Sequence, residues 1–219
     1  MKTKLISFDV WNTLLSPNPE YAKQRNQWLS DKFNIPISRI EYVYNNVKNQ
    51  LDNLVEKKHQ CLSNKDVYSK FLRSIGIFDY NRIKLRDELE YMFEEYPPIY
   101  LSETIKYLHD IQEQGIKLSI ASNTNFIRGK TLNKAVISKW GINWKFGVFS
   151  DQINHPKPHP QFWKSVTNRA YLTMGILPEE IIHIGDNKLC DGSCIQSGIH
   201  YQYNESPSTL LTTLENLKV

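Results

Sequence analysis

Four short stretches of the sequence combine reactive polar side chains with an apolar run that precedes them. The stretches contribute the following side chains, in chain order: Asp9, Ser122 with Asn123, Lys157, and Asp186 with Asp191. Carboxylates, a hydroxyl and an ammonium group are together sufficient for phosphoryl transfer through a covalent aspartyl-phosphate. Such chemistry requires that all of them reach one place in the fold.

The charges of these side chains set a condition on that chemistry. A carboxylate nucleophile at Asp9 repels a phosphate dianion unless positive charge neutralises both. Lys157 supplies one positive charge. A Mg²⁺ ion held by Asp9 and Asp186, with a backbone carbonyl and waters, would supply the rest. Ser122 and the backbone N–H groups that follow it are suited to hold the non-bridging phosphate oxygens.

The apolar run before each reactive stretch is typical of a buried strand. Strands are predicted over residues 4–10, 117–121, 146–149, 181–184 and 200–203. Segments with helical periodicity alternate with them, at residues 102–114, 129–139, 161–175 and 208–217. This alternation predicts an α/β fold with a doubly wound, mostly parallel sheet, in which ligands bind beyond the carboxyl ends of the strands.

A long helical block separates the first strand from the rest of this pattern. It has no strand signal and four segments with helical periodicity, at residues 20–33, 38–60, 64–76 and 81–95. An insertion of roughly 80 residues is too long for a loop. We therefore expect a helical cap over residues 17–97, and an α/β catalytic core formed by residues 1–16 and 98–219. A cap inserted there would cover the ligand-binding edge of the sheet.

The four reactive stretches resemble the four motifs of the haloacid dehalogenase superfamily, in order and over nearly the whole chain. The similar segments are residues 8–14, 121–124, 157–162 and 178–192. The resemblance implies a Rossmann-like core, a helical cap of the type inserted after the first motif, and Mg²⁺ as cofactor. It assigns roles as follows: catalysis to Asp9, Ser122 and Lys157, substrate binding to Ser122, Asn123 and Lys157, and metal binding to Asp9, Asp186 and the carbonyl of Trp11.

The first motif departs from the family pattern at one position that matters for the chemistry. The phosphatases of the family usually carry a second Asp two residues after the nucleophile, as general acid for the leaving group, and Trp11 stands there in this sequence. General acid catalysis is worth about 10²–10⁴-fold, so its loss handicaps the cleavage of alkyl phosphates. Asn12 replaces a more usual Gly, and Asn tolerates a left-handed backbone, so the loop geometry can be kept.

Three functions are compatible with the sequence. The first is a Mg²⁺-dependent phosphatase. The second is a 2-haloacid dehalogenase, because a halide leaves without a proton and the dehalogenases of the family also lack the second Asp. Those enzymes need no metal, however, and lose the acidic residue that corresponds to Asp186. The third, a catalytically weak relative that serves as a binding protein, is supported only by Trp11. The presence of Asp186 and Asp191 therefore favours the phosphatase.

Asp191 has two interpretations. Its carboxylate could orient Lys157 or a metal-bound water from behind the reacting groups. It could equally cap the N-terminus of a helix that follows it, which Asp does well.

The composition of the 219-residue chain indicates an ordinary globular protein, with 40% apolar and 23% charged residues. The net charge of +4 is small, and the chain lacks the basic blocks typical of a nucleic-acid surface. No stretch is apolar enough to span a membrane, and Asp9 interrupts the first apolar run too early for a signal peptide. Three cysteines fit a reducing compartment.

We expect a cytoplasmic enzyme for a small phosphorylated molecule, with neither nucleic acid nor membrane as partner. No motif indicates an oligomeric state.

Overall fold

The computed structural model describes residues 3–217. Its centre is a five-stranded, all-parallel sheet with the order β3-β2-β1-β4-β5. The strands are β1 (Leu5–Phe8), β2 (Lys117–Ser122), β3 (Trp144–Phe149), β4 (Ile181–Gly185) and β5 (His200–Tyr203). The predicted α/β fold with a Rossmann-like parallel sheet is confirmed, and each strand ends within two residues of its predicted limits.

The central strand β1 determines which loops meet. Its four side chains are all buried, and it pairs with β2 on one side and β4 on the other. Phe8 lies opposite both Ile120 and Ile184. Because the three strands are parallel and in register, they end at the same edge of the sheet, and the residues that follow them come together there.

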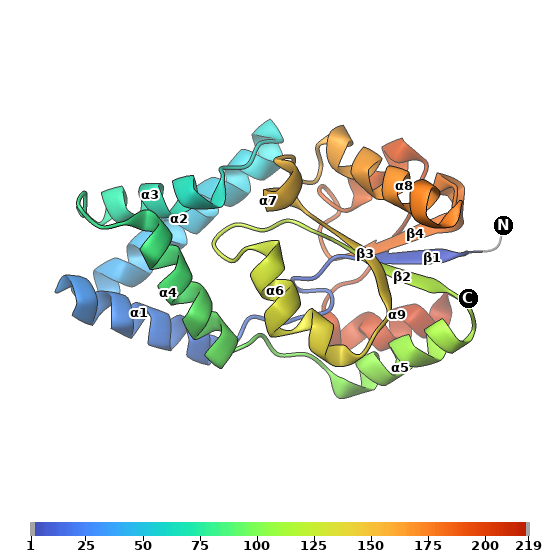
Figure 1. The fold of residues 1–219 in the computed structure, drawn as a ribbon, viewed down its shortest axis with the longest axis horizontal. Coiled ribbons are helices and arrows are strands. Elements are labelled where there is room, and N and C mark those ends of the chain that lie inside the picture. Colours follow the sequence, from blue (N-terminus) through green and yellow to red (C-terminus); the bar gives the residue numbers. More distant parts are fainter. Residues whose placement is uncertain (1–2, 218–219) are drawn as a thin grey trace.

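Helices cover both faces of the sheet (Figure 1). Helices α5 (Ser102–Glu113) and α9 (Leu210–Asn216) lie on one face, and α8 (Pro160–Met174) lies on the other. Successive β1 residues point to opposite faces, so Ile6 joins the apolar cluster under α5 and α9, whereas Leu5 joins the cluster under α8. Burial on both faces explains why the three inner strands β1, β2 and β4 are mostly apolar in the sequence.

Four further helices lie beyond the carboxyl ends of the strands (Figure 1), and we call them the cap. They are α1 (Pro19–Phe33), α2 (Ile37–Lys58), α3 (Asn64–Ser74) and α4 (Arg82–Glu95). Side chains of Asn18, Ser63 and Asn81 accept backbone N–H groups at the starts of α1, α3 and α4, which satisfies donors that a helix leaves free. The cap encloses an apolar cluster of its own.

The two connections between cap and core run side by side. Ser16 and Ile99 exchange two backbone hydrogen bonds, of 2.8 and 2.9 Å, and Asn18 Nδ2 donates to the carbonyl of Pro97 at 2.9 Å. The chain therefore enters and leaves the cap at one place. The division of the chain into a cap of residues 17–97 and a core of residues 1–16 and 98–219 stays a prediction. Of the predicted core, residues 1, 2, 218 and 219 lie outside the described residues.

Three sequence-based expectations need correction. The helix expected over residues 129–139 ends earlier, because α6 (Gly129–Ala135) is followed by a 3-10 turn at Ile137–Trp140. The last helix begins as a 3-10 turn at Pro207–Thr209. Three short elements were not predicted at all, α7 (Ser150–Ile153) and the 3-10 turns at Pro178–Glu180 and Gly192–Ser197, because elements of three to six residues are too short to show periodicity. Among residues 3–217, no helix has the length and hydropathy needed to cross a bilayer.

The loop after β2 reaches from the core into the cap. Its Phe126 is 5% exposed and belongs to the apolar cluster of the cap. The Phe126 ring stacks on Tyr44 with centroids 4.3 Å apart and meets Tyr68 edge-on at 5.6 Å. A core residue thus completes the interior of the cap.

We expect Phe126→Ala to destabilise the protein by about 3 kcal/mol, because the substitution removes a buried aromatic ring and leaves a cavity in the cap. Urea unfolding at equilibrium measures the change. Phe78→Ala is the matched control, since the Phe78 side chain is 77% exposed and its loss should cost little. Equal stability of the two variants would contradict the anchoring role of Phe126.

Candidate active site

Lys157 is the centre of a buried group of charged side chains. It lies between α7 and α8, and only 2% of its surface is exposed. Its ammonium Nζ donates to Asp9 Oδ1 at 2.6 Å, to Asp191 Oδ1 at 2.6 Å and to the carbonyl of Ala121 at 2.9 Å. These acceptors use all three ammonium protons. The contacts join the carboxyl ends of β1 and β2 to the loop after β4.

Asn123 holds the backbone of Lys157 in place. Its Oδ1 accepts from the Lys157 N–H at 2.8 Å, and its Nδ2 donates to the Lys157 carbonyl at 2.9 Å. With the side chain of Asn123 so engaged, its expected contact with substrate would come from the backbone N–H. Ser122 is fully buried, and its hydroxyl donates to the Asn123 carbonyl at 3.3 Å. Both lie beside Lys157 as expected, and their roles toward a phosphate stay predictions.

Asp191 is fixed behind the site from several directions. Its Oδ1 lies 3.0 Å from His183 Nε2, and its Oδ2 accepts from the Asn187 N–H at 3.0 Å. The other ring nitrogen of His183 lies 3.2 Å from the Ser7 hydroxyl. The Asp191 side chain makes no capping hydrogen bond to the 3-10 turn that follows it. Of its two interpretations, the geometry matches the one in which Asp191 orients Lys157.

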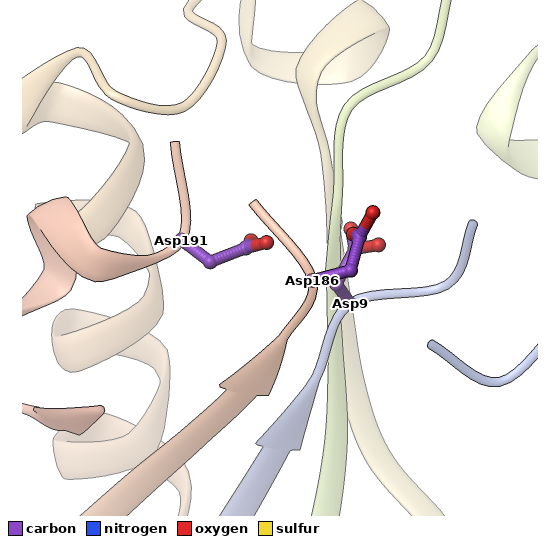
Figure 2. A group of neighbouring side chains, drawn as sticks. All are labelled: Asp9, Asp186 and Asp191. Carbon is purple, nitrogen blue, oxygen red and sulfur yellow. The ribbon is translucent and has the colours of Figure 1, made fainter. Parts of the chain in front are cut away.

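Three carboxylates converge on one point at this edge of the sheet (Figure 2). One oxygen each of Asp9, Asp186 and Asp191 can be chosen so that all lie within 4.8 Å of one another. Asp186 also accepts a hydrogen bond from Asn12 Nδ2 at 3.4 Å. Asn12 has a φ of 57°, which is the left-handed conformation expected from its type. The turn after β1 thereby faces the loop after β4.

The ionisation of these groups follows from burial and from their neighbours. Burial, and to a smaller extent the negative charge of Asp191, raise the pKa of the Asp9 carboxyl to about 7 against the opposing effect of the Lys157 ammonium. Burial also favours the neutral form of Asp191, but Lys157 and His183 outweigh it and hold the pKa of Asp191 below its usual value. Burial and Asp191 together raise the pKa of Asp186. The site therefore has more negative charge than Lys157 alone neutralises.

This donor set fits a hard divalent cation. All its ligand atoms are oxygens, which Mg²⁺ prefers, and the excess of carboxylates favours bound positive charge. Asp9 and Asp186 are the expected ligands, with the carbonyl of Trp11. Lys157 occupies Oδ1 of both Asp9 and Asp191, and Asn187 occupies Oδ2 of Asp191. Asp191 is thus the least available of the three, in keeping with its expected place outside the ligand set.

The side chain of Trp11 packs toward the cap. Its ring meets Phe93 of α4 edge-on at 6.3 Å, and Phe93 in turn meets Tyr21 of α1 at 5.4 Å. An indole donates only through its ring N–H and cannot deliver a catalytic proton. The position of the usual general acid is therefore filled by an aromatic contact between the first motif and the cap.

Sequence reasoning missed the residues that support this site. His183 and Asn187 hold Asp191 from within β4 and from the loop after it. Across the cap boundary, the buried carboxylate of Glu90 pairs with Arg128 and accepts from the Thr131 hydroxyl at 2.7 Å. The one available signal was His183, a titratable residue inside an apolar strand. The other partners are far apart in the sequence.

Comparison with known proteins shows the family of the chain. The family model of haloacid dehalogenase-like hydrolases matches residues 3–191, so the chain belongs to this family. No curated protein matches in a sequence search. Among solved structures, the magnesium-bound HAD hydrolase YfnB of Bacillus subtilis has a TM-score of 0.74 at 17% identity, over 98% of this chain and 100% of its own.

Two other similar structures are a dehalogenase and an enzyme bound to magnesium and phosphate. A 2-haloacid dehalogenase of Pseudomonas syringae pv. tomato has a TM-score of 0.66 at 18% identity, over 98% of this chain and 99% of its own. The enzyme bt-2542 of Bacteroides thetaiotaomicron, in complex with magnesium and inorganic phosphate, has a TM-score of 0.61 at 16% identity, over 93% and 95%. At these identities the likeness establishes the fold, and the chain is a hydrolase of this family by its match to the family model.

We expect Gly185→Ala to disrupt the support of Asp191. A Cβ at Gly185 would overlap the Asp191 carboxylate, which is held on the other side by Lys157 and His183 and has no room to move. The substitution should cost about 1–3 kcal/mol of stability, measured by denaturant unfolding. Gly192→Ala is the control, because its Cβ would meet the Tyr201 ring at an ordinary 3.4 Å. A tolerated Gly185→Ala would mean that Asp191 is free to shift.

Proposed function

We propose that the protein is a Mg²⁺-dependent hydrolase of a small phosphorylated substrate, which acts through an aspartyl-phosphate at Asp9. The observation that carries the proposal is the gathering of the Asp9, Asp186 and Asp191 carboxylates within 4.8 Å of one another, where a single buried ammonium, Lys157, pairs with two of them, Asp9 and Asp191. A metal-free reaction on an anionic substrate would gain nothing from Asp186, since its charge would repel the substrate. In a metal-dependent reaction, the Asp186 carboxylate would instead serve as a ligand of the divalent cation.

Each residue has a distinct part in this proposal. An oxygen of Asp9 attacks phosphorus, the bond to the leaving oxygen breaks, and that oxygen departs with the electron pair. Water then hydrolyses the acyl phosphate, which restores Asp9 and releases phosphate. Lys157 neutralises negative charge beside Asp9, and Ser122 with the backbone N–H of Asn123 would hold phosphoryl oxygens. Asp9, Asp186 and the Trp11 carbonyl would hold the Mg²⁺, which when bound lowers the charge repulsion between nucleophile and phosphate.

A 2-haloacid dehalogenase is the second candidate, and Trp11 is the observation in its favour. A halide leaves carbon without a proton, so a displacement by Asp9 would need no general acid at that position. A dehalogenase is among the similar structures, as is an enzyme bound to magnesium and phosphate. A catalytically weak binding protein is a third possibility, but it gives no reason for a buried Lys157 shared between two carboxylates.

Phosphate esters, acyl phosphates and 2-haloacids, each assayed with Mg²⁺ and with chelator, test the proposal directly. We expect turnover of phosphorylated compounds that depends on Mg²⁺, and none of the haloacids. Asp9→Asn should lower the rate at least about a thousandfold, because it removes the nucleophile. Dehalogenation that persists in chelator would instead support the second candidate.

Among phosphorylated substrates, we expect aryl and acyl phosphates to react faster than alkyl phosphates. An alkoxide needs a proton as it leaves, and Trp11 cannot give one, whereas a phenolate or carboxylate departs unprotonated. The difference should approach the 10²–10⁴-fold that general acid catalysis supplies. Steady-state kcat/KM values on a matched aryl and alkyl pair measure it.

Trp11→Asp is the complementary variant, and it should gain on alkyl phosphates while changing little on aryl ones. Trp11→Asn is the control, because Asn is similar in size to Asp but has no acidic proton. Both substitutions open the same cavity, so a difference between them reports on proton donation. Equal rates on both substrate classes in the unaltered protein would show that another group donates the proton.

A further inference from the structure

The cap is attached strongly to one side of the catalytic site. Asn64 Nδ2 donates to the carbonyls of Asn125 and Phe126 at 2.8 and 2.9 Å, and the Tyr68 hydroxyl donates to the Phe126 carbonyl at 3.0 Å. Glu90 pairs with Arg128 and Thr131 in the same loop and in α6. With Phe126 buried in the cap, these contacts bind α3 and α4 firmly to the chain after β2.

On the opposite side, toward the loop after β4, the attachment is slight. Among the side-chain hydrogen bonds and ion pairs of residues 3–217, one joins the cap to the chain beyond residue 150. In it, Asn187 Nδ2 donates to Glu56 Oε1 at 3.1 Å. Asn187 directly follows Asp186, so the contact lies on the metal-binding side of the site. Glu56 is on the last turn of α2, one turn beyond Asp52, which accepts from Asn125 Nδ2 at 3.3 Å.

Asn187 is held rigidly enough to serve as a fixed point. Its Oδ1 accepts from the N–H groups of Leu189 and Cys190 at 3.0 and 2.9 Å, and its own N–H donates to Asp191. The loop after β4 therefore keeps its shape through contacts within the core. The amide Nδ2 of Asn187 is not used by these contacts within the core, and it donates to Glu56 of the cap.

We propose that Glu56 is a positioning residue whose contact with Asn187 closes the cap over the Asp186 side of the catalytic site. A cap bound firmly along the loop after β2 and weakly at the loop after β4 opens on the weak side first. One hydrogen bond to a part-exposed carboxylate shifts such an equilibrium by about three- to tenfold. The contact is thus strong enough to favour the closed cap and weak enough to break as substrate enters.

The thiol of Cys190 reports on this closure without any assay of activity. It is buried beside Lys157 and Asp191, next to the loop that Glu56 contacts, and burial raises its pKa to about 12. Its labelling by a maleimide, resolved by peptide mass spectrometry, should be three- to tenfold faster in Glu56→Ala. Cys194, buried under α8 in the core, should be unaffected and serves as the internal standard.

Three further variants test the contact. Glu41 is on α2 like Glu56, and it accepts a similar hydrogen bond from Asn26 Nδ2 at 3.3 Å, but this contact lies within the cap. Glu41→Ala should therefore leave the labelling of Cys190 unchanged. Glu56→Gln keeps an acceptor for Asn187 and should stay within about twofold of the unaltered protein. Asn187→Ala also removes the acceptor of the Leu189 and Cys190 N–H groups, so its Cys190 should be labelled at least as fast as in Glu56→Ala. Adding Glu56→Ala to Asn187→Ala should give no further increase, because the contact between the two residues is already lost.

The effect on catalysis rests on the proposed function, but the effect on labelling does not. At saturating Mg²⁺, Glu56→Ala should lower kcat/KM on an aryl phosphate about three- to tenfold, and Glu41→Ala should not. If the unaltered protein has no Mg²⁺-dependent phosphatase activity, the proposed function fails and labelling still decides the role of Glu56. Equal Cys190 labelling in Glu56→Ala and Glu41→Ala would overturn the inference. Faster labelling of both Cys190 and Cys194 in Glu56→Ala would also overturn the inference, because it would indicate that the whole core is destabilised.

Discussion

The buried ammonium of Lys157 is the interaction on which the rest of the site depends. An unpaired charge in the interior costs several kcal/mol, so Lys157 can be buried only if its acceptors reach it in good geometry. Asp9, Asp191 and the Ala121 carbonyl do so at 2.6–2.9 Å. Asp9 directly follows β1, Ala121 lies near the end of β2, and Asp191 lies in the loop after β4. A single pairing requirement therefore fixes these three segments relative to one another.

That arrangement leaves an imbalance of charge, and the imbalance has chemical meaning. Lys157 neutralises one negative charge where three carboxylates meet, and burial raises the pKa of Asp9 rather than lowering it. A site built only for stability would avoid such an excess. A divalent cation bound there, as we propose, would offset this excess, so the arrangement of the carboxylates favours cation binding. In the proposed phosphatase reaction, Trp11 would remove the usual proton donor and would leave the charges of the site unchanged.

The attachment of the cap to the core is also uneven. The loop after β2 contributes to both parts of the structure, because it carries Asn123, directly after Ser122 at the edge of the sheet, and Phe126 inside the cap. Asn123 also holds the backbone of Lys157. The cap is therefore attached mainly through this loop, and the loop after β4, held within the core, is the side at which we propose that cap and core separate.

Local sequence determined the elements and most of the candidate residues. Strand and helix periods depend on which side chains face the interior, and the reactive residues stand out because each follows an apolar strand. Tertiary structure alone decided the partners. His183 against Asp191, Glu90 against Arg128, and Glu56 against Asn187 join residues whose separation in the chain carries no periodic signal. Such pairs depend on strand order and on how the cap is oriented, and both result from packing the whole chain rather than from any local segment.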